Sequence, residues 1–170
     1  MRRWLFLVPI VYAVAVVQTS LADAIRVGHV TPDLMALLAV VWVLVDPGRR
    51  AFLAAGAIGL AADLISPGPL GVGMASFLLA GYGVARLRTR RDLEHVVAQV
   101  LCVGAATSVL ATGQAIGSWL PGHTAVPLGT LLVRALGVGL YTAGVSVPLL
   151  LVIGWIREPH RARRRKLAAF

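Results

Sequence analysis

Six runs of apolar residues, separated by short polar gaps, fill most of this 170-residue chain. A helix that crosses a bilayer core about 30 Å thick needs roughly 20 mainly apolar residues. Backbone groups at membrane depth must satisfy one another, which favours helices. The pattern therefore predicts an all-α fold, a single polytopic transmembrane bundle of about six helices. In chain order, the predicted helices occupy residues 4–22, 32–46, 51–65, 70–87, 96–120 and 128–156, and a basic tail occupies 157–170.

Composition supports a membrane protein. Hydrophobic residues make up 58% of the chain and charged residues only 14%, whereas a soluble domain is usually about 45–50% apolar and about 25% charged. Too few polar residues are present to cover a surface in water, so we expect lipid to cover it. The length suits one compact domain.

The second and third predicted helices are short for a full crossing. At about 1.5 Å per residue, residues 32–46 would extend about 22 Å. Two full crossings, with local thinning of the bilayer or with buried ends, fit the pattern best, and a re-entrant hairpin with residues 49–50 at its tip is the alternative. A second alternative concerns the start of the chain, where two arginines, an apolar stretch and the small residues at 20–22 resemble a signal peptide.

Basic residues gather on one side of the predicted membrane. With six crossings, the first residues, the gaps 46–50 and 86–95, and the tail lie together, and they hold all but Arg26 and Arg134 of the 16 basic residues. Cytoplasmic loops carry an excess of Lys and Arg, so we expect both termini in the cytoplasm. This distribution also explains the net charge of +9 without any nucleic acid partner. The basic tail is interpreted as a topology anchor or, alternatively, as a protein-docking site.

No group of residues in the sequence indicates catalysis or a metal site. The four histidines lie far apart, and no pair has the spacing of metal ligands on one helix. A glycine-rich stretch at 68–73 lacks the Lys-Ser/Thr pair of a phosphate-binding loop. We therefore expect no enzymatic activity, no cofactor and no metal. Cys102, the single cysteine, is predicted to be a buried thiol.

Small residues recur at four-residue spacing, and such spacing lets helices approach closely in lipid. Gly113 and Gly117 form the clearest pair. We expect them to pack inside the bundle, although such a pair also suits the docking of a partner's transmembrane helix.

Two charged residues are predicted at membrane depth. Asp63 lies near the end of the third helix, and Arg134 lies about two turns into the sixth. Ionisable groups are costly there and usually pair or face inward. We hypothesise an ion pair between the two, and the alternative is an arginine that extends alone to the interface.

A recognisable motif spans residues 31–88. Thr31-Pro32-Asp33-Leu34 opens the second helix, the glycine-rich third helix ends in Asp63-Leu64-Ile65-Ser66, and Leu70-Gly71 opens the fourth. Together with the chain length, the apolar runs and Gln18, this motif resembles the rod shape-determining protein MreD family. The resemblance implies roles in helix starts, close packing and one buried polar contact for Pro32, Asp33, Gly59, Asp63, Ser66 and Gly71.

The resemblance implies a role and not a reaction. It implies a non-catalytic scaffold in the bacterial inner membrane, within the cell-elongation machinery that controls cell shape and peptidoglycan synthesis. The implied partners are MreC, by direct contact, and a wider assembly of MreB, RodA and a class B penicillin-binding protein. The family is also similar to the substrate-binding membrane subunits of energy-coupling-factor transporters, which leaves a vitamin or small-molecule transporter subunit as the alternative.

Overall fold

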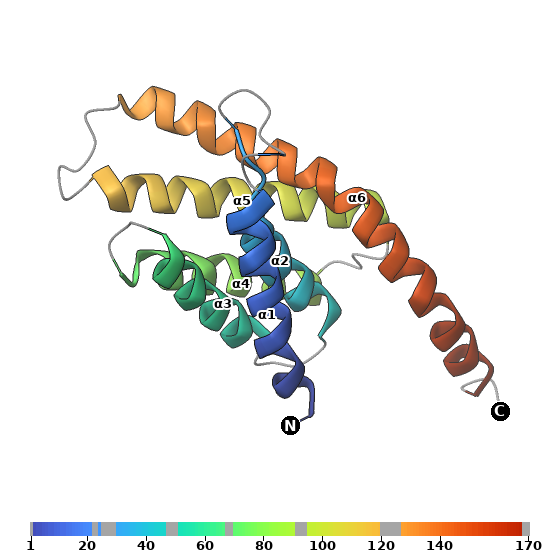
Figure 1. Ribbon diagram of the computed structural model, residues 1–170. Helices are drawn as coiled ribbons and strands as arrows, with labels where there is room; N and C mark the ends of the chain where they lie inside the picture. Colours follow the sequence, from blue (N-terminus) through green and yellow to red (C-terminus); the bar gives the residue numbers. More distant parts are fainter. Residues whose placement is uncertain are drawn as a thin grey trace.

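The computed structural model describes residues 2–21, 24, 30–46, 51–66, 70–90, 95–119 and 127–167 of the chain. These residues form six α-helices, so the predicted all-α fold is confirmed. The helices are α1 (Arg2–Leu21), α2 (Leu34–Val45), α3 (Ala51–Ile65), α4 (Val72–Arg90), α5 (Val96–Trp119) and α6 (Leu128–Leu167). Each predicted range overlaps one helix, and α6 continues well past the predicted end at residue 156, extending beyond the other helices (Figure 1).

Helix α2 lies at the centre of the bundle. It contacts each of the other five helices, whereas α1 contacts only α2 and α3 among the described elements (Figure 1). Most of its residues are buried: Met35, Ala36, Leu37, Ala39, Val40, Val41, Val43 and Leu44. A helix that is apolar on all sides is usually enclosed by its neighbours. Protein surrounds α2 on nearly every face, which explains how so short an apolar helix can lie within the bundle.

Helices α2 and α4 each begin two residues later than predicted, and each start has a local cause. Helix α2 begins at Leu34 because Asp33, with extended φ −93° and ψ 95°, is the N-cap residue. The predicted start at residue 32 is therefore two residues too early. Helix α4 begins at Val72, after Gly71 has taken a positive φ of 96°.

A basic side chain joins α4 to the far end of α2. The Arg88 guanidinium donates hydrogen bonds to the carbonyl oxygens of Val43, at 3.1 Å, and Asp46, at 2.6 Å. The last carbonyls of a helix have no partner within it, and a basic side chain can satisfy them. One of the arginines expected to set topology therefore also fixes helix packing.

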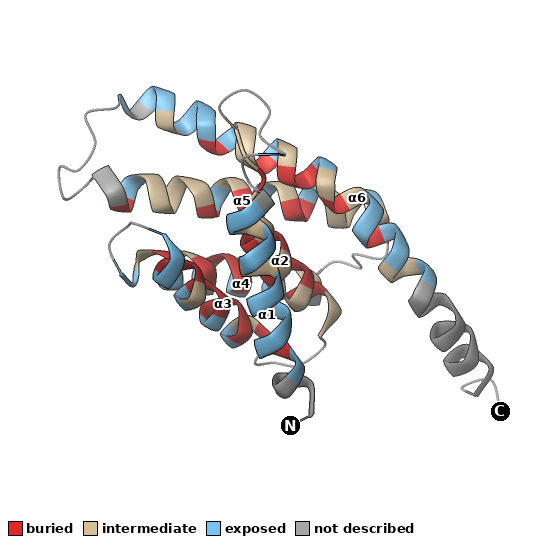
Figure 2. Ribbon diagram, viewed as in Figure 1, coloured by how far each residue is buried: buried red, intermediate tan, exposed pale blue. Residues whose placement is uncertain are grey.

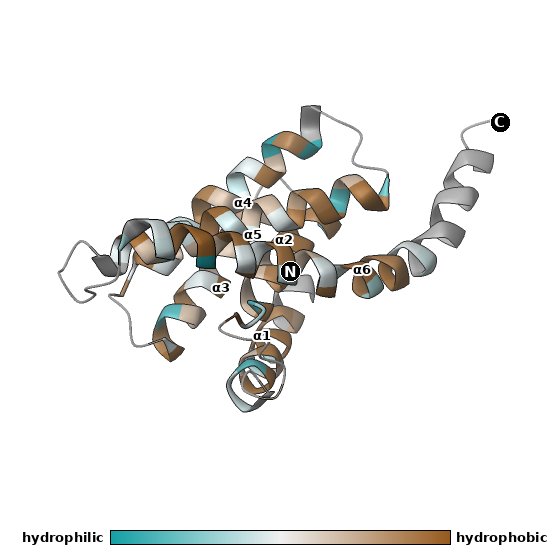
Figure 3. Cartoon of the chain, turned by 90° about the horizontal axis from the view of Figure 1, so that it is seen from above, coloured by the Kyte–Doolittle hydropathy of each residue, from teal (hydrophilic) through white to brown (hydrophobic). Residues whose placement is uncertain are grey.

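Large apolar side chains cover the outside of the bundle. In the described part of the chain, two helical segments are long and apolar enough to cross a membrane, Val96–Gly117 and Gly129–Trp155. Leu101 on α5 and Leu140 on α6 are 68% and 78% exposed. Figure 2 shows this exposure, and Figure 3 shows apolar residues along most helices with hydrophilic residues mainly towards their ends. An apolar surface of this extent is typical of contact with lipid.

Candidate functional site

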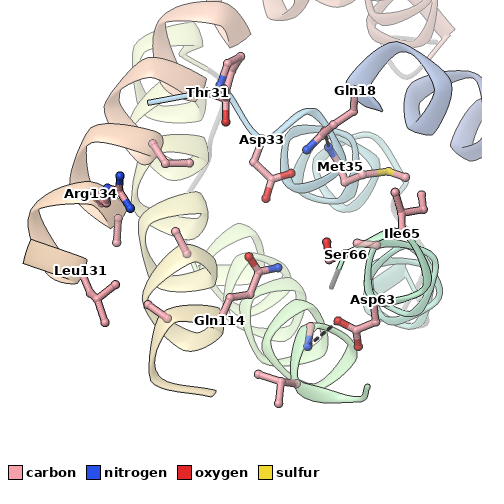
Figure 4. A pocket seen from close by; sticks show the side chains of 18 of the residues that line it. Gln18, Thr31, Asp33, Met35, Asp63, Ile65, Ser66, Gln114, Leu131 and Arg134 are labelled. Carbon is pink, nitrogen blue, oxygen red and sulfur yellow. Dashed lines mark hydrogen bonds between the residues drawn. The ribbon is translucent and has the colours of Figure 1, made fainter. Parts of the chain in front are cut away.

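A cavity of about 450 Å³ lies where ends of the six helices meet (Figure 4). Every helix, or the segment next to it, contributes to its lining. The apolar part of the lining consists mainly of alanine, valine and leucine side chains. The polar side chains that line it are Gln18, Thr31, Asp33, Asp63, Ser66, Gln114 and Arg134.

Asp63 binds the backbone at the start of the neighbouring helix. Its Oδ2 accepts hydrogen bonds from the N–H groups of Gly71, at 2.9 Å, and Met74, at 3.0 Å. Its Oδ1 accepts one from Gly73 at 3.0 Å. The first N–H groups of a helix lack partners within it and carry a partial positive charge. The carboxylate of α3 therefore caps α4 and fixes the two helices relative to each other.

Two glycines make this cap possible. Gly71 adopts a φ of +96°, which residues with a side chain rarely do. A Cβ at Gly73 would collide with Asp63 Oδ1. The sequence pointed to Gly71, but it gave no signal for Gly73, whose importance comes entirely from the approach of α3.

Asp33 joins three helices through its backbone and its side chain. Its Oδ1 accepts the Ala36 N–H at 2.9 Å, as expected of an N-cap residue. Its own N–H donates to the hydroxyl of Thr142, a fully buried residue of α6, at 3.1 Å. From α1, Gln18 bonds the Asp33 side chain and also accepts the Met35 N–H at 3.0 Å. Asp33 therefore connects α1, α2 and α6.

The predicted ion pair between Asp63 and Arg134 is wrong. Asp63 accepts three hydrogen bonds from backbone N–H groups, and Figure 4 shows Arg134 on the opposite wall of the cavity. Three N–H groups close to Asp63 in the chain satisfy its charge more readily than a side chain on a distant helix. In the described part of the chain, Arg134 and Gln114 have no hydrogen-bonding or ionic partner.

The small residues expected to mediate close packing lie inside the bundle. A Cβ added to Gly59 would contact Phe77 of α4 at 2.7 Å. Gly113 faces Ser76, and Gly117 is in close contact with Val72, both also on α4. The Gly113–Gly117 face is therefore occupied by this chain and is not open to a partner's helix.

The structure brings most of the motif residues to one place. Pro32, Asp33, Asp63 and Ser66 all line the cavity, whereas Gly59 lies in the interface of α3 with α4. Among the described residues, no three His, Cys, Asp or Glu side chains are grouped in a way that could hold a metal ion. The motif therefore forms a set of helix caps around a cavity.

The model of the rod shape-determining protein MreD family matches residues 1–121 of the chain. The chain belongs to the MreD family. Membership supports a role in the machinery that determines rod shape. No match was found among curated proteins or solved structures, so the expected likeness to transporter subunits is not confirmed. The part that matches the MreD family holds both capping aspartates and ends before α6, so Arg134 lies outside it.

Proposed function

We propose that this chain is a non-catalytic scaffold subunit of the cell-elongation machinery in the bacterial inner membrane, where it supports cell shape and peptidoglycan synthesis. The family match over residues 1–121 carries the proposal. The site geometry supports it, because Asp33 and Asp63 both bond to backbone N–H groups and hold helices in place.

The proposed direct partner is MreC, within a wider assembly that includes MreB, RodA and a class B penicillin-binding protein. Because the Gly113–Gly117 face is filled, a partner helix would lie on the outward faces of the bundle. Photo-crosslinking residues placed at Leu79, Val109 and Leu140, which are 71%, 60% and 78% exposed, would locate it. Crosslinks to MreC at one of these helices, and none from the buried Phe77, are the expected result.

The proposed topology has six crossings, with both termini in the cytoplasm and the cavity facing outward. Single cysteines at Ser66 and His95, in a background with Cys102→Ser, test it. An impermeant thiol reagent should label the first position in intact cells and the second only after the membrane is opened. Labelling of both, or of His95 alone, would contradict this topology.

Depletion and complementation test the function itself. A rod-shaped bacterium whose own MreD is depleted should become round, and expression of this chain should restore rods and the capture of MreC. Asp63→Ala should fail in both respects, whereas Gly83→Ala, at a position with open space around it, should succeed. Restored shape without any association with MreC would contradict the proposed scaffold role.

A further inference from the structure

Among the residues that the structure describes, Arg134 has no counter-ion. It belongs to the apolar segment Gly129–Trp155, and nothing in the described part of the chain bonds to its guanidinium. A charged group in such a segment is costly unless it is paired. The two acidic residues of the same cavity are not available, because Asp33 and Asp63 cap helices. Arg134 is exposed, so an anion from outside the described chain can reach its guanidinium.

Other donors without partners line the same cavity. Gln114 carries an amide with two N–H donors, and Thr31 and Ser66 carry hydroxyl donors. None of the three side chains makes a hydrogen bond within the described residues. Figure 4 shows Gln114 pointing into the space between Arg134 and Asp63. The cavity therefore presents a cation and several neutral donors to whatever enters it.

The two carboxylates do not make the cavity repel anions. Each is bonded to backbone N–H groups at a helix N-terminus, Asp33 at α2 and Asp63 at α4. The positive end of a helix carries about half an elementary charge, which offsets part of each carboxylate. Of the described charged groups that line the cavity, Arg134 is the one without a hydrogen-bonding or ionic partner.

The remaining lining is apolar, and it includes Ala15, Ile65, Val72, Leu131 and Val138. A volume of about 450 Å³ suits the polar part of an amphiphile or a small organic anion. In the proposed topology, Arg134 lies near the outer interface of the membrane, where lipid phosphate is the most abundant anion. The planar guanidinium can bind phosphate through two parallel hydrogen bonds.

We propose that this cavity binds a phosphate group, either of a phospholipid headgroup or of a soluble phosphate ester, with Arg134 as its main contact and Gln114 as the second donor. The site goes beyond the family assignment, because Arg134 lies outside the residues that match the family. It also does not depend on the proposed scaffold role.

Native mass spectrometry of the full chain in neutral detergent tests the proposal. The probes are phosphatidylglycerol, the phosphate-free lipid diacylglycerol, and glycerol phosphate as a soluble ester. The variants are Arg134→Gln, Arg134→Lys and Gln114→Leu. Arg86→Gln is the matched control, because it removes one positive charge from the other end of α4. Melting temperatures without ligand identify any variant that has failed to fold.

We expect the protein to retain bound phosphatidylglycerol in the mass spectrum and not to retain diacylglycerol. Arg134→Gln should weaken binding about tenfold or more, as for loss of a charged hydrogen bond. Gln114→Leu should weaken it less, and Arg134→Lys should retain part of it, while Arg86→Gln stays like the wild type. Competition by glycerol phosphate would assign the site to soluble esters, and its failure would assign it to lipid headgroups. Equal binding of diacylglycerol, or wild-type affinity in a folded Arg134→Gln, would overturn the proposal.

Discussion

Asp63 Oδ1 and Gly73 occupy the same small space, because the oxygen accepts the Gly73 N–H at 3.0 Å and lies where a Cβ of that residue would be. The acid on α3 and the glycine on α4 therefore depend on each other. A larger residue at position 73 would displace the carboxylate, and without the carboxylate position 73 would no longer need to be glycine. This relationship fixes the corner between α3 and α4 and one wall of the cavity.

Gly73→Ala should destabilise the protein by about 2 kcal/mol, the usual cost of forcing atoms into a packed site. The new methyl group would push the Asp63 carboxylate away from its three donors. Gly83→Ala is the control on the same helix, because a Cβ there meets nothing within 4 Å. It should leave stability unchanged or raise it slightly, since alanine favours helices. Denaturation in detergent micelles measures both, and equal effects would contradict this account.

Substitutions of Asp63 should follow a defined order. Asp63→Asn keeps one acceptor but loses the charge, at a cost of about 1–2 kcal/mol, and Asp63→Ala leaves three N–H groups without partners, at about 3 kcal/mol or more. The exchange of charges, Asp63→Arg with Arg134→Asp, should not restore stability, because the carboxylate is needed at the start of α4. Recovery of the melting temperature by that exchange would mean that an ion pair exists after all.

Thr142→Val should cost about 1–2 kcal/mol, because it leaves the Asp33 N–H without an acceptor. Valine has nearly the same shape, so packing changes little. Thr19→Val is a suitable comparison, since the exposed Thr19 hydroxyl bonds only to carbonyls of its own helix. Hydrogen exchange of the Asp33 and Met35 amides should accelerate in the first variant alone.

Gly139→Ala should loosen α6 from α5. A Cβ there would collide with the Ser108 hydroxyl and lie 2.7 Å from the Gly104 carbonyl oxygen. Backbone atoms cannot move aside as a side chain can, so we expect a loss of about 2–3 kcal/mol. Gly144→Ala, one turn further along α6 in open space, should be tolerated. Disulfide trapping between cysteines on α5 and α6 would show whether the first variant separates the helices.

Local patterns predicted the helices and part of the site. Apolar runs and their polar gaps place the six helices, and the residue types around Asp33 and Asp63 mark helix starts. These signals act over a few residues. The partners of Asp63 lie only eight to eleven residues away, yet pairing by membrane depth alone favoured Arg134. The carboxylate binds nearby backbone N–H groups instead, and a hydropathy pattern does not reveal such donors.

Contacts between distant segments could not be predicted. Thr142 lies 109 residues after Asp33, and its role requires knowing that α6 packs beside the start of α2. Gly73 is one glycine among 18 in the chain, and only the approach of α3 distinguishes it. Gln114 and Arg134 become candidates for ligand binding only when their lack of partners is known.

The cap that Asp63 places on α4 also bears on how the chain enters a membrane during synthesis. While α3 is alone, the Asp63 carboxylate has no hydrogen-bond donors, and an ionisable group in a membrane-inserting segment is costly. The N–H groups that bind this carboxylate belong to residues synthesised within the next eleven positions of the chain. We therefore expect the translocation machinery to release α3 and α4 to lipid together, as one hairpin, with the Asp63 carboxylate already hydrogen-bonded to the start of α4.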